Sequence, residues 1–307
     1  MAEYTNQAGN YVGIEVSGDA FNAVRVDANG KVLEELQLPF DRTGETLAQL
    51  VSAVNKLKEK FSGIEKIGVA VPGLVRRATS RVAVSAHIPD HSGLDLTGEV
   101  AAATGLETLI ENDANAAAYG EFKAGAGRGS NNLFYVTLGR GVGGAFIIEG
   151  NIWKGASGFA GEFGYVPINS EGTRLEEVAS SGNIVRRTVS RYKQDSTSSL
   201  SRLDENQIGI ADIVAAAEKE DDFAQMMLER TGTYVGMAVA SVINLLNIEK
   251  IVIGGEIMQA KHLVLDSVIA RAKELAFAPS FENTEILAGE LGGNASAIGA
   301  ALLANGA

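Results

Sequence analysis

The residue pair Asn112-Asp113 is the first place in this sequence where residue types and spacing indicate chemistry. The short apolar run at residues 107–110 predicts a strand, and the alanines that follow Asp113 predict a helix. An aspartate at such a junction can act as a general base toward a hydroxyl group, while the neighbouring amide orients the substrate. It can also simply cap the helix by accepting a backbone N–H bond. Both roles stay open at this point.

Glycine-rich corners after three predicted strands form the second chemical signal. They lie at Gly18, at residues 139–144 and at Gly254-Gly255. Glycine lets backbone N–H groups approach an anion closely, so such corners can hold phosphate, although they can also be plain tight turns. None of them fits the P-loop or the dinucleotide-binding fingerprint, because the sequence has no Gly-Lys-Ser/Thr and no G-x-G-x-x-G within a βαβ unit.

Glu162 is a further candidate, because it lies in the glycine-rich stretch at residues 158–164. Its neighbours are small or aromatic, which is unusual for a glutamate that only faces solvent. An ordinary surface position is the alternative for this residue.

Composition excludes several classes of protein. The 307 residues suggest about two domains. The net charge of −12 argues against a nucleic-acid partner, which would require clustered Lys and Arg. Because the chain has no cysteine, a disulfide scaffold, a thiolate zinc site and a cysteine nucleophile are excluded.

Targeting signals are not apparent in the sequence. The N-terminal residues show neither a basic nor an apolar segment of the kind found in secretory signals. The longest apolar stretch, residues 235–248, is too short to span a bilayer. We therefore expect a soluble, cytoplasmic protein with no membrane partner.

An internal repeat is the most informative feature of the organisation. The order strand, glycine corner, strand, Gly/Asn turn and strand begins at residue 11 and again at residue 133, about 125 residues later. Helices are expected at residues 43–60, 96–104, 223–246, 261–276 and 295–304. Asp212 is expected to cap a helix at 213–219, and the serine-rich residues 196–201 are expected to form a mobile loop.

Six motifs together resemble the signature of the ROK family of sugar kinases and sugar-responsive repressors. They are ENDANAAAYGE at residues 111–121, VPG at 71–73, LGRGVGG at 138–144, GASGFAGE at 155–162, IGG at 253–255 and IGAAL at 298–302. Their order and spacing match from Val12 to Leu303, so the chain is identified as a member of this family.

The resemblance implies an α/β, two-domain, actin/hexokinase-like (ribonuclease-H-like) fold with an interdomain cleft where ATP and a sugar meet. Residues 1–111 are then expected to form a small N-terminal domain that is completed by a C-terminal helix at 295–307. Residues 112–294 are expected to form the large domain.

The resemblance also implies a role for each matching residue. Asp113 would be the catalytic base that takes the proton from the sugar hydroxyl as it attacks the γ-phosphoryl group. One base, glycine loops and Mg²⁺ suffice for phosphoryl transfer, which depends mostly on positioning and charge neutralisation. The substrate-binding residues would include Gly73, Asn112, Glu162 and Glu176. The ATP site would contain Gly18, Asp19, Gly139, Arg140, Gly141, Gly143, Gly254 and Gly255.

The phosphate hairpins depart from the family pattern. The first one reads Asp-x-Gly-Gly-Thr-Lys in the family and Glu-Val-Ser-Gly-Asp-Ala at residues 15–20 here. Asp19 replaces a threonine, and a carboxylate beside a triphosphate is repulsive by about 1 kcal/mol or more unless a metal bridges them. Arg140 replaces a small threonine in the second hairpin. Either it binds phosphate and compensates Asp19, or the two residues pair and close an unused phosphate site.

The sugar side departs as well. The family's zinc module needs a histidine and three cysteines, but here Tyr165 holds the histidine position and residues 169–174 replace the cysteine loop, so no zinc is expected. Tyr165 is expected to line the sugar site and can donate one hydrogen bond there. His87 falls in a segment that lines the sugar site in the family; metal ligation and a plain surface position are its alternatives.

The sequence therefore favours a glucokinase-like enzyme that uses ATP to phosphorylate a hydroxyl of a hexose or amino sugar, with a homodimer as the expected assembly. The alternative is a sugar-binding relative with an altered phosphate site and little or no turnover. A DNA-binding regulator is not expected, because the first predicted strand begins at Tyr11 and leaves no room for a preceding helix-turn-helix.

Overall fold

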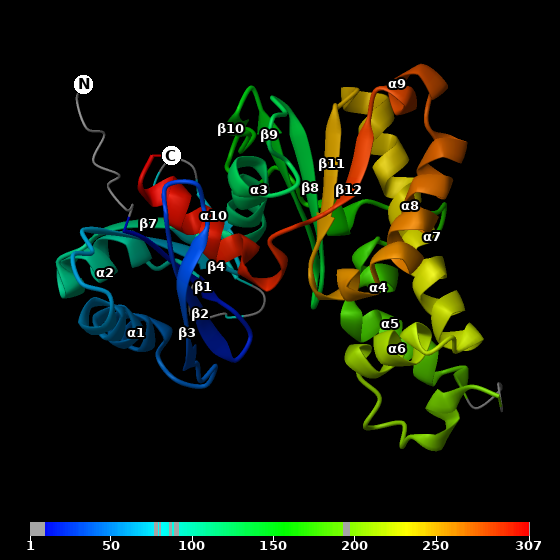
Figure 1. Cartoon of the computed structure of the whole chain (residues 1–307), viewed down its shortest axis with the longest axis horizontal. Helices are drawn as coiled ribbons and strands as arrows, with labels where there is room; N and C mark the ends of the chain where they lie inside the picture. The colour runs from blue at the N-terminus through cyan, green and yellow to red at the C-terminus, as the bar shows by residue number, and fades with distance from the viewer. Residues whose placement is uncertain are drawn as a thin grey trace, which may run out of the picture. The chain divides into compact units, whose positions relative to one another are not determined.

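The computed structural model describes residues 10–76, 79, 81–85, 88, 92–192 and 197–306. Contacts divide the chain into two units (Figure 1). The first comprises Met1–Gly129, Asn151–Ala160 and Gly293–Ala307, and the second comprises Ser130–Gly150 and Gly161–Gly292. The domain boundary expected between residues 111 and 112 stays a prediction.

The first unit is built on a five-stranded sheet with the order β3-β2-β1-β4-β7. Strands β1 and β2 are antiparallel, as are β2 and β3, whereas β4 is parallel to both β1 and β7. The opening meander and the following strands predicted from the sequence are thus confirmed. The strands are β1 (Tyr11–Val16), β2 (Ala20–Val26), β3 (Val32–Pro39), β4 (Lys66–Val71) and β7 (Glu107–Asn112).

Apolar residues cover one face of this sheet. Val12 and Ile14 of β1 share a core with Leu50 and Leu57 of α1 (Thr46–Lys60) and with Val100 of α2 (Leu96–Thr104). Because side chains alternate along a strand, the residues between them face the other side of the sheet. A small antiparallel pair, β5 (Leu74–Val75) and β6 (Val82–Val84), follows β4 in the chain.

Helix α10 (Ala295–Ala304) contacts β1, β4 and also α3 (Asp113–Ala124), and it approaches them more closely than any side chain would allow. A Cβ on Gly13 of β1 would lie 1.9 Å from the Ala297 carbonyl oxygen, and one on Gly68 of β4 would lie 1.9 Å from that of Ala300. Glycine at these positions lets the helix backbone rest directly on the sheet.

Replacing Gly68 with alanine is therefore expected to lower the free energy of unfolding by about 2 kcal/mol, the usual cost of overpacking a tight interior. The matched control is Gly182→Ala, because a Cβ at Gly182 meets nothing within 4 Å. Urea denaturation of both variants measures the difference. Equal stability of the two variants would contradict the close-packing explanation.

The second unit repeats the strand arrangement of the first. Its sheet has the order β9-β8-β11-β12, with β8 and β9 antiparallel and with β11 parallel to both β8 and β12. In both sheets the antiparallel hairpin strands come first in the chain, and the later strands are added parallel to the first hairpin strand, β1 or β8. The predicted internal repeat is therefore confirmed. The strands are β8 (Leu133–Leu138), β9 (Val142–Ile148), β11 (Lys250–Gly254) and β12 (Glu285–Ala288), while the two-residue strand β10 (Asn151–Ile152) lies in a segment that belongs to the first unit.

The long helices α7 and α8 run side by side in the second unit (Figure 1). Gly232 of α7 allows this approach, because a Cβ there would lie 2.4 Å from the Val264 carbonyl oxygen. None of the helices in the described part of the chain is long and apolar enough to cross a membrane. The helices are α4 (Glu176–Ala179), α5 (Ser181–Val189), α6 (Ile210–Glu218), α7 (Asp222–Leu246), α8 (Lys261–Leu275) and α9 (Ala278–Glu282).

Two local predictions are wrong. Asp212 is not the N-cap of α6: the helix begins at Ile210, and the Asp212 carboxylate reaches back to accept a hydrogen bond from the Gly209 N–H at 2.8 Å. The serine-rich segment 196–201 is not simply a loop, because Ser199–Arg202 form a 3₁₀ helix that buries Leu200; Ser196 lies outside the described residues. The Asp221 carboxylate organises this turn by accepting hydrogen bonds from Ser198 and Ser199.

Candidate active site

Asn112 and Asp113 lie where β7 ends and α3 begins. Asn112 is the N-cap of α3, and its Oδ1 accepts a hydrogen bond from the Asn115 N–H at 3.0 Å. Asp113 is the first residue of the helix, and its Oδ1 accepts from the Ala114 N–H at 2.9 Å. Helix capping, which the sequence left open as a role for Asp113, is thus performed by Asn112. The helix N-terminus favours negative charge at Asp113.

Parallel pairing brings Gly73 to the same place. Val71 of β4 pairs with Asn112 of β7, so the residues that follow both strands emerge at one edge of the sheet. The Asn112 side-chain amide donates to the Gly73 carbonyl oxygen at 3.0 Å and to Asp113 Oδ1 at 3.0 Å. One amide therefore links the turn after β4 to the aspartate carboxylate.

Glu111 is a buried carboxylate directly before this pair, with only 3% of its surface exposed. Its Oε1 accepts hydrogen bonds from the Asn112 N–H and from the Asn115 side-chain amide, both at 3.0 Å. Its Oε2 forms an ion pair with the Lys154 ammonium. A buried charge requires such compensation. Lys154 therefore keeps the Glu111 carboxylate in place beneath Asn112 and Asp113.

Glu15 places a second carboxylate near Asp113. It lies on β1 opposite Ala70 of β4. Burial, together with the negative charge of Asp113, raises the pKa of Glu15 to about 7, although hydrogen bonds from Asn22 and Ser296 oppose the shift. The two carboxylates therefore interact, which was not foreseen from the sequence.

This pKa predicts a pH dependence of stability in the metal-free protein. Between pH 4.5 and about 7 the unfolded chain releases the Glu15 proton while the folded chain retains it, so folding becomes less favourable as pH rises. The Glu15→Gln variant should lack this loss and should therefore gain stability over the wild type at pH 8 more than at pH 5. Urea denaturation at both pH values measures the gain, with the exposed Glu59→Gln as control. A gain that is equal at both pH values would contradict the assignment.

The first glycine corner is a tight hairpin turn. The Ser17 N–H and hydroxyl both donate to the Ala20 carbonyl oxygen at 2.9 Å, and the Phe40 N–H donates to the Asp19 carbonyl oxygen at 2.9 Å. The Arg42 guanidinium donates to the Gly18 carbonyl oxygen. Arg42 thus adds a positive charge to this corner, and nothing in the local sequence signalled that position.

The other two glycine corners meet within the second unit. Gly139 and Gly255 follow β8 and β11, which are parallel neighbours, so both corners emerge at one edge of the sheet. Gly255 has a φ of +97°, and a Cβ there would lie 2.3 Å from the Leu138 carbonyl oxygen. The Ser181 N–H at the start of α5 donates to the Gly139 carbonyl oxygen at 2.8 Å, and its hydroxyl donates to Glu256. The two glycine corners and the start of α5 therefore lie together, with the Ser181 N–H already engaged by the Gly139 carbonyl oxygen.

Glu162, Tyr165 and Glu176 also come together in the second unit. Glu162 precedes the 3₁₀ helix Phe163–Tyr165, and the Tyr165 N–H donates to its carbonyl oxygen at 3.1 Å. Gly164 lies against Glu176, since a Cβ on Gly164 would be 3.3 Å from the Glu176 Cβ. Glu176 Oε2 accepts a hydrogen bond from the Val142 N–H at 2.9 Å. Glu176 thus connects the segment of Glu162 to the corner that contains Gly141 and Gly143.

Each unit therefore gathers its own group of candidate residues. The first unit contains Gly18, Asp19, Gly73, Asn112 and Asp113, and the second contains Gly139, Arg140, Gly141, Gly143, Glu162, Tyr165, Glu176, Gly254 and Gly255. His87 lies outside the described residues. Sequence reasoning missed Lys154, Glu15, Arg42, Ser181 and Glu256, whose partners lie far away along the chain.

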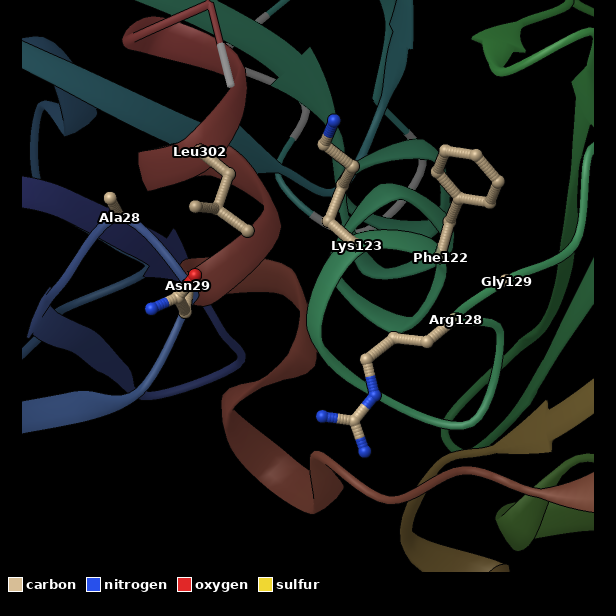
Figure 2. Close-up of a pocket in the computed structure, with 7 residues that line it drawn as sticks. All are labelled: Ala28, Asn29, Phe122, Lys123, Arg128, Gly129 and Leu302. Atoms are coloured by element: carbon tan, nitrogen blue, oxygen red, sulfur yellow. The ribbon is translucent and has the colours of Figure 1, made fainter.

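A surface hollow of about 620 Å³ lies elsewhere in the first unit (Figure 2). Phe122 and Lys123 in its wall belong to the last turn of α3, whereas Asp113 begins that 12-residue helix. A helix of this length spans about 18 Å, so the hollow lies well away from the candidate base. Its lining residues are Ala28, Asn29, Phe122, Lys123, Arg128, Gly129 and Leu302.

Comparison with known proteins gives the class of the molecule. The model of the ROK family matches residues 11–307, so the chain belongs to the ROK family. This confirms the resemblance seen in the motifs. The α/β fold class is confirmed as well: the structure of a ROK family glucokinase from Streptomyces griseus in complex with glucose and AMPPNP superposes with a TM-score of 0.85 at 27% identity, over 97% of this chain and 100% of that one.

Relatives at this level of similarity include both kinases and regulators. A glucokinase from Halalkalibacterium halodurans is 30% identical over 94% of this chain and 93% of its own length. A xylose repressor from Bacillus subtilis is 26% identical over 97% of this chain and 78% of its own length. Family membership therefore leaves the choice between enzyme and sensor to the residues of the site.

Proposed function

We propose that this protein is an ATP-dependent kinase that phosphorylates a hydroxyl group of a hexose or amino sugar, as a cytoplasmic homodimer. The observation that supports this most is the arrangement of Asp113 at the first position of α3, with Asn112 bridging it to Gly73. A general base is of no use to a protein that only binds a sugar.

In this proposal Asp113 removes the proton from the attacking hydroxyl. Asn112, Gly73, Glu162, Tyr165 and Glu176 bind and orient the sugar. Glu176 has one oxygen engaged with the Val142 N–H, which leaves Oε1 to accept from a sugar hydroxyl. Carboxylates that accept hydrogen bonds from neutral hydroxyls form strong, directional contacts suited to this task.

The glycine corners bind the nucleotide in this proposal. Gly139, Gly141 and Gly143 would approach the phosphates, with Gly254 and Gly255 beside them. Arg140 supplies a guanidinium group that can form a bidentate pair with phosphate. The corner at Gly18 and Asp19 would bind phosphate in the first unit, and Arg42, which donates to the Gly18 carbonyl oxygen, adds a positive charge to that corner.

Mg²⁺ would arrive with the nucleotide. In the part of the chain that the structure describes, no group of three or more His, Cys, Asp or Glu side chains could hold a metal ion. Mg²⁺ commonly takes most of its ligands from phosphate oxygens and water, with one or two carboxylates added. Glu15 offers one such carboxylate, and the ion would neutralise charge on the transferred phosphoryl group.

A sugar sensor without turnover is the second candidate. The similarity to a xylose repressor over 97% of this chain favours it, and so does the carboxylate of Asp19 in a phosphate hairpin. The two candidates share the sugar site and differ in the use of ATP.

Calorimetric titration of ATP-Mg²⁺, with and without a panel of hexoses and amino sugars, separates the candidates. Nucleotide binding that tightens with one sugar, followed by formation of ADP, supports the kinase and identifies its substrate. Sugar binding with no nucleotide heat at millimolar ATP would refute the kinase and leave the sensor, or an enzyme that uses another donor such as polyphosphate.

A further inference from the structure

The segment between the two candidate sugar-binding glutamates forms a small hairpin at residues 166–175. Pro167 and Arg174 form an antiparallel bridge, and the Leu175 N–H donates to the Val166 carbonyl oxygen at 2.9 Å. The Ile168 N–H donates to the Thr173 carbonyl oxygen at 2.9 Å. The hairpin starts next to Tyr165, which is three residues after Glu162, and ends next to Glu176.

The tip of the hairpin is held by its own side chains. Asn169 Oδ1 accepts from the Thr173 N–H at 2.9 Å, and the Asn169 amide donates to the Thr173 hydroxyl at 3.0 Å. Gly172 takes a φ of +79°, which closes the turn. The tip is therefore ordered by local contacts, separately from the base of the hairpin.

Arg174 contacts both sides of that base. Its guanidinium carbon lies 4.5 Å from the centre of the Tyr165 ring, well within the range of a cation–π contact. Its backbone N–H donates to Glu177 Oε2 at 3.1 Å, which fixes the residue at the start of α4. Arg174 thus connects the segment that carries Glu162 to the helix that begins with Glu176.

The backbone bonds of the hairpin join residues 166–168 to residues 173–175 and do not involve Tyr165. Gly164 lies against Glu176 but has no side chain that could fix the distance between the segment of Glu162 and Glu176. The Tyr165 ring is 58% exposed, so core packing does not fix its position. The inner side is held separately, by the hydrogen bond from the Val142 N–H to Glu176.

We propose that Arg174 is a positioning residue for sugar binding. By stacking on Tyr165 it clamps the base of hairpin 166–175 and so sets the separation of the Glu162 and Glu176 carboxylates, which must match the spacing of two hydroxyls on a neutral sugar ring. This inference rests on the proposed function, in which both glutamates accept hydrogen bonds from the sugar.

The test uses the full chain with the variants Arg174→Ala, Tyr165→Ala and the combination of both. Arg202→Ala, an exposed arginine on the 3₁₀ helix Ser199–Arg202, is the matched control for loss of charge. Three quantities are measured: amide hydrogen exchange at Ile168 and Leu175, the Kd for glucose and glucosamine, and the KM for ATP.

Arg174→Ala should speed exchange at both amides and raise the Kd for the sugar about fivefold, the factor that one exposed cation–π contact supplies. The KM for ATP should stay within about twofold, because the glycine corners are held by other contacts. The double variant should bind sugar no more weakly than the weaker single variant, since both substitutions break one clamp. Arg174→Lys, which keeps the charge over the ring, should recover part of the affinity.

Different results overturn the two proposals. If the wild type binds sugar and Arg174→Ala binds it equally well, or if the two substitutions act additively, the clamp is refuted and the proposed function stands. If the wild type neither binds nor phosphorylates any sugar, the proposed function is refuted. Exchange at Ile168 and Leu175 then decides the clamp alone: unchanged rates in Arg174→Ala refute it, and faster rates support it.

Discussion

Replacing Asp113 with asparagine should lower kcat for sugar phosphorylation by about two to four orders of magnitude, the contribution of a well-placed general base. Asparagine keeps the size of the side chain and can still accept from the Ala114 N–H, so the start of α3 should remain intact. The Kd for the sugar should therefore change only severalfold. A coupled assay for ADP release and a calorimetric titration of the sugar measure the two quantities.

Asp95→Asn is the control for this experiment. Asp95 also lies at the beginning of a helix in the first unit, where it caps α2 by accepting from the Gly98 N–H at 3.0 Å, and asparagine caps equally well. This variant should keep full activity. An Asp113→Asn protein that retains its rate would show that another group accepts the proton.

Replacing Lys154 with methionine should lower the free energy of unfolding by about 3–5 kcal/mol, the usual cost of removing one partner from a buried ion pair. The reason is Glu111, whose carboxylate is 3% exposed and would lose the cation that pairs with it. Activity should fall as well, because Glu111 orients the Asn112 N–H and the Asn115 amide. Urea denaturation measures the loss of stability.

Two further variants separate this buried pair from an ordinary one. Lys66→Met removes the cation from an exposed pair with Glu107, whose side chain is 69% exposed, and should cost at most about 1 kcal/mol. Combining Lys154→Met with Glu111→Gln should recover much of the lost stability, since no buried charge then remains. Losses of equal size for Lys154→Met and Lys66→Met would contradict the importance of burial.

Much of the fold could be predicted, because local patterns of apolar and turn-forming residues indicate its strands and helices. The alternation of apolar residues and the Asn29-Gly30 turn define the first meander, and the same pattern defines the hairpin that starts at Leu133. The helices α4 and α5 were missed, because Ser180 and Ser181 interrupt a stretch of mixed polarity between them. A short helix of this kind depends on tertiary contacts more than on its own sequence.

The candidate site could be predicted only where the motif itself contains the residues. Asn112 and Asp113 are adjacent in the chain, so their pairing follows from the sequence. The ion pair of Lys154 with Glu111 and the contact of Arg42 with the Gly18 carbonyl oxygen join segments that are distant in sequence. Strand pairing and helix packing bring such partners together. These long-range contacts cannot be predicted from the local pattern of a single sequence.

The position of α10 has a consequence for the order in which the protein is made. Residues 295–304 complete the core beside β1, β4 and α3, yet the ribosome adds them after every strand of both sheets. Synthesis adds about 5–20 residues per second. The face of β1 and β4 that carries Gly13 and Gly68 therefore stays uncovered for on the order of ten seconds. The second unit is complete at Gly292, just before this helix is made, so the nascent first unit is the part that stays incomplete longest and most needs protection by chaperones.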